Sequence, residues 1–118
     1  MRPSLSFGAD KCQERAMARK LGVLVSSDKH LDKVIRLCQA AKNKGDVEVT
    51  IFFTHLGTVL TQDPRFGELE GLAKMSLCNV GFESHNLKPP VVGIGEKDYA
   101  TQARHGELIE ECDRYVAF

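Results

Sequence analysis

The sequence has no apolar run that approaches the ~20 residues needed to cross a bilayer, which argues against a membrane-spanning helix. Its first 20 residues also lack the apolar core of a signal peptide, because charged side chains interrupt them, among them Lys11, Glu14, Arg15, Arg19 and Lys20. An ordinary secretory signal is therefore not expected. We expect a protein that works in the cytoplasm and does not bind a membrane.

Neither sign of charge predominates in this chain of 118 residues. Lys and Arg together number 16, as do Asp and Glu, so the formal net charge is zero. The basic surface that nucleic acids and anionic membranes require is therefore not indicated. A neutral chain also lacks the repulsion that keeps monomers apart, which permits self-association. Hydrophobic residues make up 42% of the chain, enough for the core of one domain.

Paired cysteine motifs are absent. The chain has four widely spaced cysteines: Cys12, Cys38, Cys78 and Cys112. Without a Cys-x-x-Cys or zinc-knuckle spacing, a cytosolic chain with free thiols is favoured over a disulfide scaffold. The Walker lysine pattern and the Gly-x-Ser-x-Gly elbow are missing, and the pair Gly93 and Gly95 lacks the third glycine and acidic partner of a dinucleotide site. We expect no cofactor.

Strand-like and helix-like segments alternate from residue 21 onward. Short apolar and β-branched segments predict five strands, over 21–26, 47–53, 75–78, 91–95 and 115–118. Helices are predicted over 29–44, 66–74 and 99–111, the last capped by Asp98. The alternation predicts one α/β domain with a five-stranded, mainly parallel sheet and helices on both faces. This domain spans 20–118 and follows an extension, 1–19, in which 9–20 is a candidate helix.

The helix predicted over 29–44 has the clearest periodicity. One face collects its apolar residues: Leu31, Val34, Ile35, Cys38 and Ala41. Ser27 or Asp28 offers the N-cap, and Gly45 ends the helix. Cys38 is therefore predicted to be core packing. Cys112 and His105 are assigned to the core-facing side of the last helix, together with Leu108 and Ile109.

Residues that follow the parallel strands are expected to gather at one edge of the sheet, where α/β proteins place their ligands. Cys78 ends the third strand, next to the turn-forming Asn79, and His55 follows the second strand. A thiol at a helix N-terminus would have a lowered pKa, and an imidazole would support the thiolate. Two other groups are expected on the same rim: Ser26, Ser27 and Asp28, and Gly95, Glu96 and Lys97. The alternative interpretations are a buried apolar cysteine and a solvated loop histidine.

Two further combinations are weaker. His85 lies seven residues beyond Cys78, in a stretch without clear periodicity. Cys78, His55 and His85 are residue types that suit zinc, but no two of them have a recognisable ligand spacing. No metal site is therefore predicted.

The order of features from about residue 21 to 118 resembles the DsrE/DsrF-like sulfur-relay family. Four stretches carry the resemblance: the strand over 21–27 with its following helix, the segment 49–57 with its Phe-Phe-Thr and glycine, Ser76-Leu-Cys-Asn79, and the ending over 107–118. The resemblance implies a flavodoxin-like subunit that forms trimers or hexamers. It also implies that Cys78 carries sulfur as a persulfide. Where many members continue with a second cysteine or serine and Arg-Gly, this chain has Asn79-Val80-Gly81-Phe82.

The sequence thus leads to one hypothesis and one alternative. The hypothesis is a small cytoplasmic sulfur carrier, or sulfurtransferase, that takes a persulfide on Cys78 from a donor protein and passes it to an acceptor. Its His55 would support the thiolate. The alternative is a non-catalytic oligomeric binding or regulatory protein of the same fold. Exposure and reactivity of Cys78 favour the carrier, and burial favours the alternative.

Overall fold

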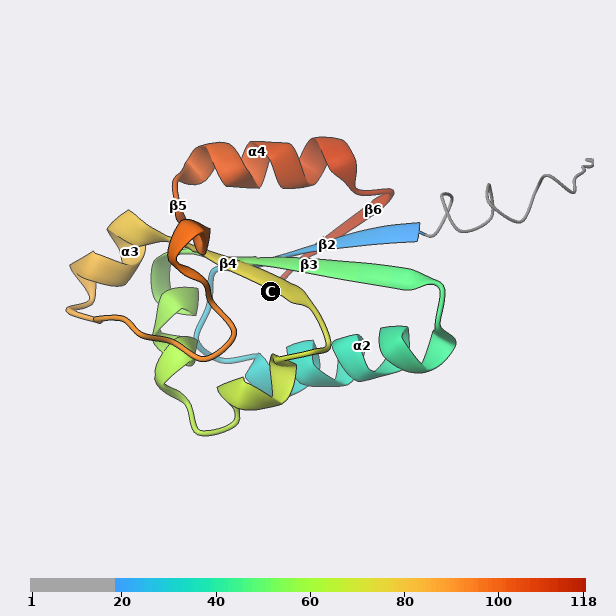
Figure 1. The fold of residues 1–118 in the computed structure, drawn as a ribbon, viewed down its shortest axis with the longest axis horizontal. Coiled ribbons are helices and arrows are strands. Elements are labelled where there is room, and N and C mark those ends of the chain that lie inside the picture. The colour runs from blue at the N-terminus through green and yellow to red at the C-terminus, as the bar shows by residue number, and fades with distance from the viewer. Residues whose placement is uncertain (1–18) are drawn as a thin grey trace, which may run out of the picture.

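The computed structural model describes residues 19–118. Its single α/β domain contains a five-stranded sheet in which every pairing is parallel, as predicted (Figure 1). The spatial order of the strands is β5-β4-β3-β2-β6. Their bounds are β2 Arg19–Val25, β3 Val47–Phe53, β4 Lys74–Cys78, β5 Tyr99–Ala100 and β6 Arg114–Ala117. Because β2 begins at Arg19, residues 19 and 20 are extended and not helical, and the rest of the predicted extension lies outside the described residues.

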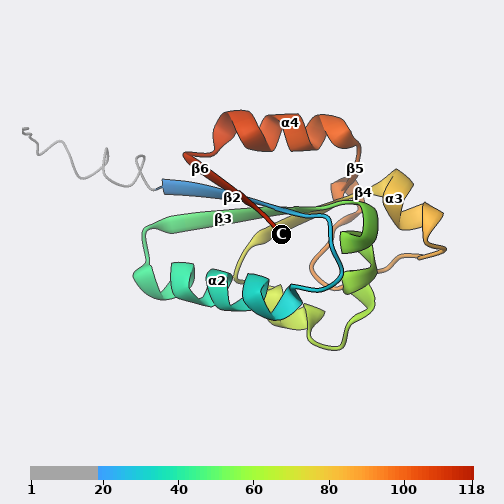
Figure 2. The same cartoon turned by 180° about the vertical axis from the view of Figure 1, so that it is seen from behind.

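One face of the sheet holds most of the core. Helix α2, Leu31–Lys44, covers it, and all five residues of its predicted apolar face are buried (Figures 1 and 2). Alternate strand positions such as Val23, Ile51 and Leu77 pack in the same cluster, as the period of two requires. Gly45, at φ 90°, ends the helix in the left-handed conformation that glycine favours. His30, not Ser27 or Asp28, precedes the first helical residue.

The other face is covered more thinly by α4, Gln102–Glu111 (Figures 1 and 2). Leu108 is the buried residue of this helix, and it packs with Phe52 and Cys78 in a small second cluster. Ile109 is exposed, so the predicted core-facing side of α4 is wrong at that position. His105 is partly buried as predicted, stacked against Phe52.

The predicted fourth strand over 91–95 is wrong. Val91 and Ile94 make only an isolated antiparallel bridge, because Gly93 at φ 80° turns the chain back on itself. The strand that completes the sheet is the two-residue β5 further along. The last helix accordingly starts at Gln102 and not at Tyr99, and its cap is Thr101, whose hydroxyl accepts from the Ala103 N–H at 3.3 Å.

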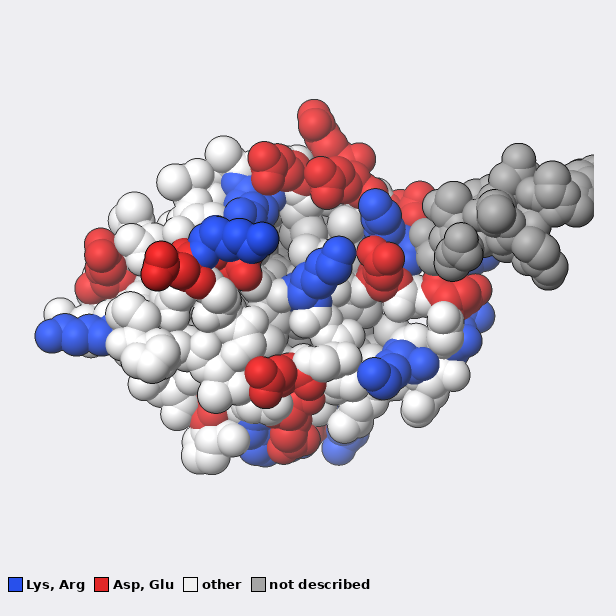
Figure 3. All heavy atoms as spheres, viewed as in Figure 1, with Lys and Arg blue, Asp and Glu red and all other residues white. Residues whose placement is uncertain are grey.

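Short helical segments fill the connections. The loop predicted after β3 is the 3₁₀ segment His55–Gln62, and the helix predicted over 66–74 shortens to the 3₁₀ turn Phe66–Leu69. Helix α3, Asn79–Ser84, follows β4 directly. Within residues 19–118, no helix is both long and apolar enough to cross a membrane. Lys and Arg are interspersed with Asp and Glu over the face in Figure 3, which matches the balanced charge.

Candidate functional site

Cys78 is the last residue of β4 and the N-cap of α3. The alternation of β4 turns Met75 and Leu77 toward the main core and leaves Cys78 with the small cluster under α4. The residue is 5% exposed. The thiol is therefore held in place by Phe52 and Leu108 and does not project into solvent.

Sheet register brings three strand ends together around Cys78. Phe53 is level with Leu77, so Thr54 comes next to Cys78 on one side. Ala100 is level with Cys78 on the other side, so Thr101 and the start of α4 follow it directly. A pocket of about 600 Å³ opens at this point. Its lining residues are Thr54, His55, Leu56, Cys78, Val80, Gly81, Ser84, His85, Thr101 and Gln102.

His55 lines the same pocket as Cys78, so the structure brings the two residues together, as expected from the strand ends. It starts the 3₁₀ segment with φ 50°, and its side chain is exposed. Gly81 of α3 approaches it closely: a Cβ there would lie 3.2 Å from the His55 backbone nitrogen. The pocket wall therefore depends on close backbone packing between α3 and this segment.

His85, at the end of α3, also lines the pocket, although its spacing gave only a weak signal. Its Nδ1 lies 2.9 Å from the Gly81 carbonyl oxygen, so Nδ1–H donates there and Nε2 keeps a free lone pair. This contact holds the His85 ring near Gly81. Gly81 is three residues after Cys78, which corresponds to a rise of ~4.5 Å along a helix axis. This half-buried imidazole is a better-fixed base than the exposed His55.

The N-terminus of α4 forms the remaining wall, which the sequence did not predict. Gln102 donates from Nε2 to the Thr54 hydroxyl at 2.9 Å, linking the ends of β3 and β5 across the pocket. The partial positive charge of a helix N-terminus favours an anion such as a thiolate. Thr101, a residue type that caps helices, was the available signal for a helix that begins at Gln102. The helix was instead predicted to start three residues too early, at Tyr99.

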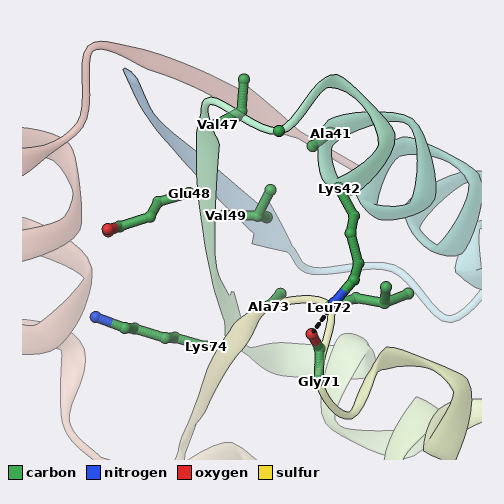
Figure 4. Close-up of a pocket in the computed structure, with 10 residues that line it drawn as sticks. Ala41, Lys42, Val47, Glu48, Val49, Gly71, Leu72, Ala73 and Lys74 are labelled. Carbon is green, nitrogen blue, oxygen red and sulfur yellow. Dashed lines mark hydrogen bonds between the residues drawn. The ribbon is translucent and has the colours of Figure 1, made fainter. Parts of the chain in front are cut away.

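Two predicted rim groups are not part of this pocket. Ser26 donates its N–H to the Phe118 carbonyl at 2.9 Å, in the gap between β2 and β6. Gly95, Glu96 and Lys97 follow a turn instead of a strand, so they do not reach the pocket. A pocket at the other end of the sheet, about 360 Å³ and shown in Figure 4, has no thiol or imidazole in its lining.

The other described thiols are in different environments. Cys38 is fully buried on α2, and burial raises its pKa to about 11. Cys112 is partly exposed after α4, and burial raises its pKa as well. Both thiols are therefore weaker nucleophiles near neutral pH than an ordinary cysteine. Cys12 lies outside the described residues, and within 19–118 no three His, Cys, Asp or Glu side chains are placed to hold a metal.

No family model and no curated protein matches this chain in sequence. A solved structure, that of the ychN protein from E. coli, superposes with a TM-score of 0.69 over 86% of this chain and 100% of that chain, at 13% identity. The likeness shows the flavodoxin-like fold of this domain, and at this identity it shows the fold alone.

Proposed function

We propose that this protein is a sulfur carrier of the DsrE/DsrF-like family, with Cys78 as the residue that holds the persulfide. The observation that carries the proposal is the register of β3, β4 and β5, which surrounds one cysteine with a pocket, an imidazole and a helix N-terminus. The fold shared with the ychN protein and the resemblance of the Ser76–Asn79 stretch support it. The reducing cytoplasm, where thiols stay free, suits this chemistry.

The proposed reaction is thiol exchange without net oxidation. The Cys78 thiolate attacks the terminal sulfur of a donor persulfide, R–S–SH. A bond forms between Cys78 Sγ and that sulfur, the donor S–S bond breaks, and the donor leaves as a thiolate that takes up a proton. An acceptor thiolate then attacks the outer sulfur of the Cys78 persulfide and releases the Cys78 thiolate.

The pocket residues have distinct roles in this proposal. His85 Nε2 accepts the proton of Cys78, directly or through one water, because its Nδ1 is engaged by Gly81. The α4 N-terminus, at Gln102, stabilises the anionic sulfur. The mouth of the pocket carries Leu56 and Val80, which are 48% and 72% exposed and offer an apolar docking rim for donor and acceptor proteins.

The second candidate is a non-catalytic oligomeric binding or regulatory protein. The burial of Cys78 favours this candidate. A thiol that is only 5% exposed offers little surface to the thiol or persulfide of another protein. In that case the pocket would hold a ligand, and the thiol would act as a small apolar wall residue. Reactivity of Cys78 in the folded protein separates the two candidates.

Limited alkylation of the folded protein with iodoacetamide near neutral pH is expected to label Cys78 before Cys38. Cys38 needs both local opening and loss of a proton whose pKa is about 11, and it should react at a useful rate only after unfolding. Peptide mass spectrometry over time measures the order. Labelling of Cys78 last, at the rate of Cys38, would favour the binding protein.

The same assay examines the imidazoles. His85→Gln is expected to slow labelling of Cys78 at neutral pH by about tenfold, since the proton acceptor is lost. His55→Gln, on the exposed side of the pocket, serves as the matched control and should leave the labelling rate unchanged. The reverse pattern would assign the proton to His55.

We also propose that the carrier is a homo-oligomer, a trimer or a hexamer. Large apolar side chains are exposed along edge strand β6 and the neighbouring α4: Ile109, Tyr115 and Val116. Among residues 19–118, no strand pairs with the outer edge of β6, and an open edge of this kind is a natural contact for a second chain. Light scattering is expected to give three or six times the 13.1 kDa mass of one chain. The mass of a single chain at micromolar concentration would contradict this.

A further inference from the structure

Thr54 lies beside Cys78 on the same face of the sheet. Phe53 is level with Leu77 in the parallel pairing of β3 with β4. The residues that follow them, Thr54 and Cys78, are therefore neighbours separated by one strand spacing of ~4.8 Å. Thr54 keeps an extended backbone, so it takes the same face as Phe52, which packs with Cys78. Thr54 and Cys78 also line the same pocket.

The Thr54 side chain is held in one place. Its backbone N–H donates to the Val25 carbonyl at 2.9 Å, and its carbonyl accepts from the Gly57 N–H at 2.8 Å. The residue is 3% exposed, and its hydroxyl oxygen accepts from Gln102 Nε2 at 2.9 Å. A β-branched side chain fixed by these three bonds keeps a single orientation.

The Thr54 hydroxyl still has a hydrogen to donate. Gln102 occupies one lone pair of the oxygen, and a hydroxyl that accepts a bond keeps its own O–H donor. Within residues 19–118 this hydroxyl makes no second hydrogen bond, to Cys78 or to any other group. Gln102 Nε2 likewise carries two hydrogens, of which one goes to Thr54. A buried donor without an acceptor is unfavourable, so an acceptor that enters here would be stabilised.

The loaded form of Cys78 supplies such an acceptor. A persulfide adds a sulfur atom ~2 Å beyond Sγ, and this outer sulfur carries the charge once the persulfide has lost its proton. Of the described residues that line the pocket, none is Lys or Arg. An anion in a largely buried site is costly unless hydrogen bonds compensate it. The charge on the outer sulfur therefore depends on hydrogen-bond donors.

We propose that Thr54 and Gln102 form a donor pair that holds the outer sulfur of the Cys78 persulfide as an anion. Thr54 donates its O–H to that sulfur, and Gln102 fixes the direction of the hydroxyl. The S–H bond of the persulfide breaks, its proton leaves to solvent, and its electron pair stays on the outer sulfur. This inference rests on the proposed function, because it names the residues that stabilise the loaded carrier.

The first measurement is the fraction of Cys78 that is loaded at equilibrium with glutathione persulfide and glutathione, at mildly alkaline pH. Thr54→Val keeps the shape of the side chain and removes the hydroxyl. It should lower the equilibrium constant for loading about tenfold, as expected for a hydrogen bond to a charged group. Thr54→Ser keeps the hydroxyl and should stay within about twofold of the wild type. Mass spectrometry of the Cys78 peptide, after capping with iodoacetamide, gives the loaded fraction.

A pH profile separates this role from a structural one. The rate at which iodoacetamide caps the Cys78 persulfide follows its anionic fraction, so the midpoint of the profile reports the pKa of the persulfide. Thr54→Val should raise that pKa by about one unit, which corresponds to a tenfold loss of anion stabilisation. The other titratable side chains that line the pocket, His55 of the 3₁₀ segment and His85 of α3, are unchanged in this variant. A hydroxyl that only holds α4 in place would affect stability and leave the midpoint unchanged.

The outcomes distinguish this inference from the proposed function. A Thr54→Val protein that loads and titrates like the wild type would overturn the inference and leave the carrier in place. A Thr54→Ser protein as impaired as Thr54→Val would overturn it as well, since the hydroxyl would not be the group that matters. A wild-type protein that takes up no sulfur on Cys78 would overturn both the inference and the proposed function.

Discussion

Replacing Gly57 with alanine is expected to lower the free energy of unfolding by about 3 kcal/mol or more. An alanine Cβ at this position would lie 2.0 Å from the Val25 carbonyl oxygen and 2.7 Å from its carbon. These are backbone atoms of a central strand, so no side chain can rotate away. The same Val25 oxygen accepts from the Thr54 N–H at 2.9 Å, and any shift that relieves the clash strains that bond.

Gly106→Ala is the matched control. Gly106 lies inside α4, and nothing lies within 4 Å of where its Cβ would be. Alanine there should raise the free energy of unfolding by about 0.5–1 kcal/mol, through helix propensity alone. Urea unfolding followed by circular dichroism measures both variants. A Gly57→Ala protein as stable as the wild type would show that the segment after β3 is not packed against β2 in this way.

The Gly57 contact also positions the candidate site. Gly57 donates its N–H to the Thr54 carbonyl at 2.8 Å, which closes the turn that presents His55 to the pocket. A residue with a side chain at this position would displace that turn. We expect the stability loss of Gly57→Ala to be accompanied by faster, less selective alkylation of the cysteines.

The parts of the fold that follow a regular repeat were predictable from sequence. The face of α2 follows the 3.6-residue period, and β2, β3 and β4 are apolar segments long enough to be recognised. The fourth strand was not predictable in the same way. Tyr99 and Ala100 pair for only two residues, too few to give a pattern, while 91–95 is apolar enough to look like a strand. The turn within 91–95 depends on the left-handed conformation of Gly93, which is seen in the structure.

The residues of the candidate site were likewise predictable only in part. Cys78 and His55 were found because both directly follow strands of a parallel sheet, and that rule needs no side-chain detail. His85 lines the same pocket because its ring contacts the Gly81 carbonyl one helical turn earlier. Gln102 lines it because α4 begins at this residue. Neither arrangement leaves a spacing motif. The burial of Cys78 depends on Leu108 of a distant helix and could not be read from the stretch around the cysteine.

Cys78→Ser is expected to abolish sulfur loading while leaving the fold and the oligomer intact. Serine keeps the shape of the side chain but cannot form a persulfide, so no sulfur-loaded protein should remain. The matched control is Cys112→Ser, which alters a thiol beside the same small cluster, next to Leu108. This control should load as the wild type does. Circular dichroism and light scattering check that both variants are folded and assembled.

The most direct test of the central claim is mass spectrometry of the wild-type protein after treatment with a persulfide donor. The protein is separated from the donor, and its persulfides are trapped by alkylation. The masses of the intact chain and of its peptides are then measured. We expect a species one sulfur atom heavier, with the added sulfur on the peptide that contains Cys78, and its loss on incubation with an acceptor thiol. An unloaded Cys78, or sulfur found equally on the other thiols and on the Cys78→Ser variant, would contradict the proposal.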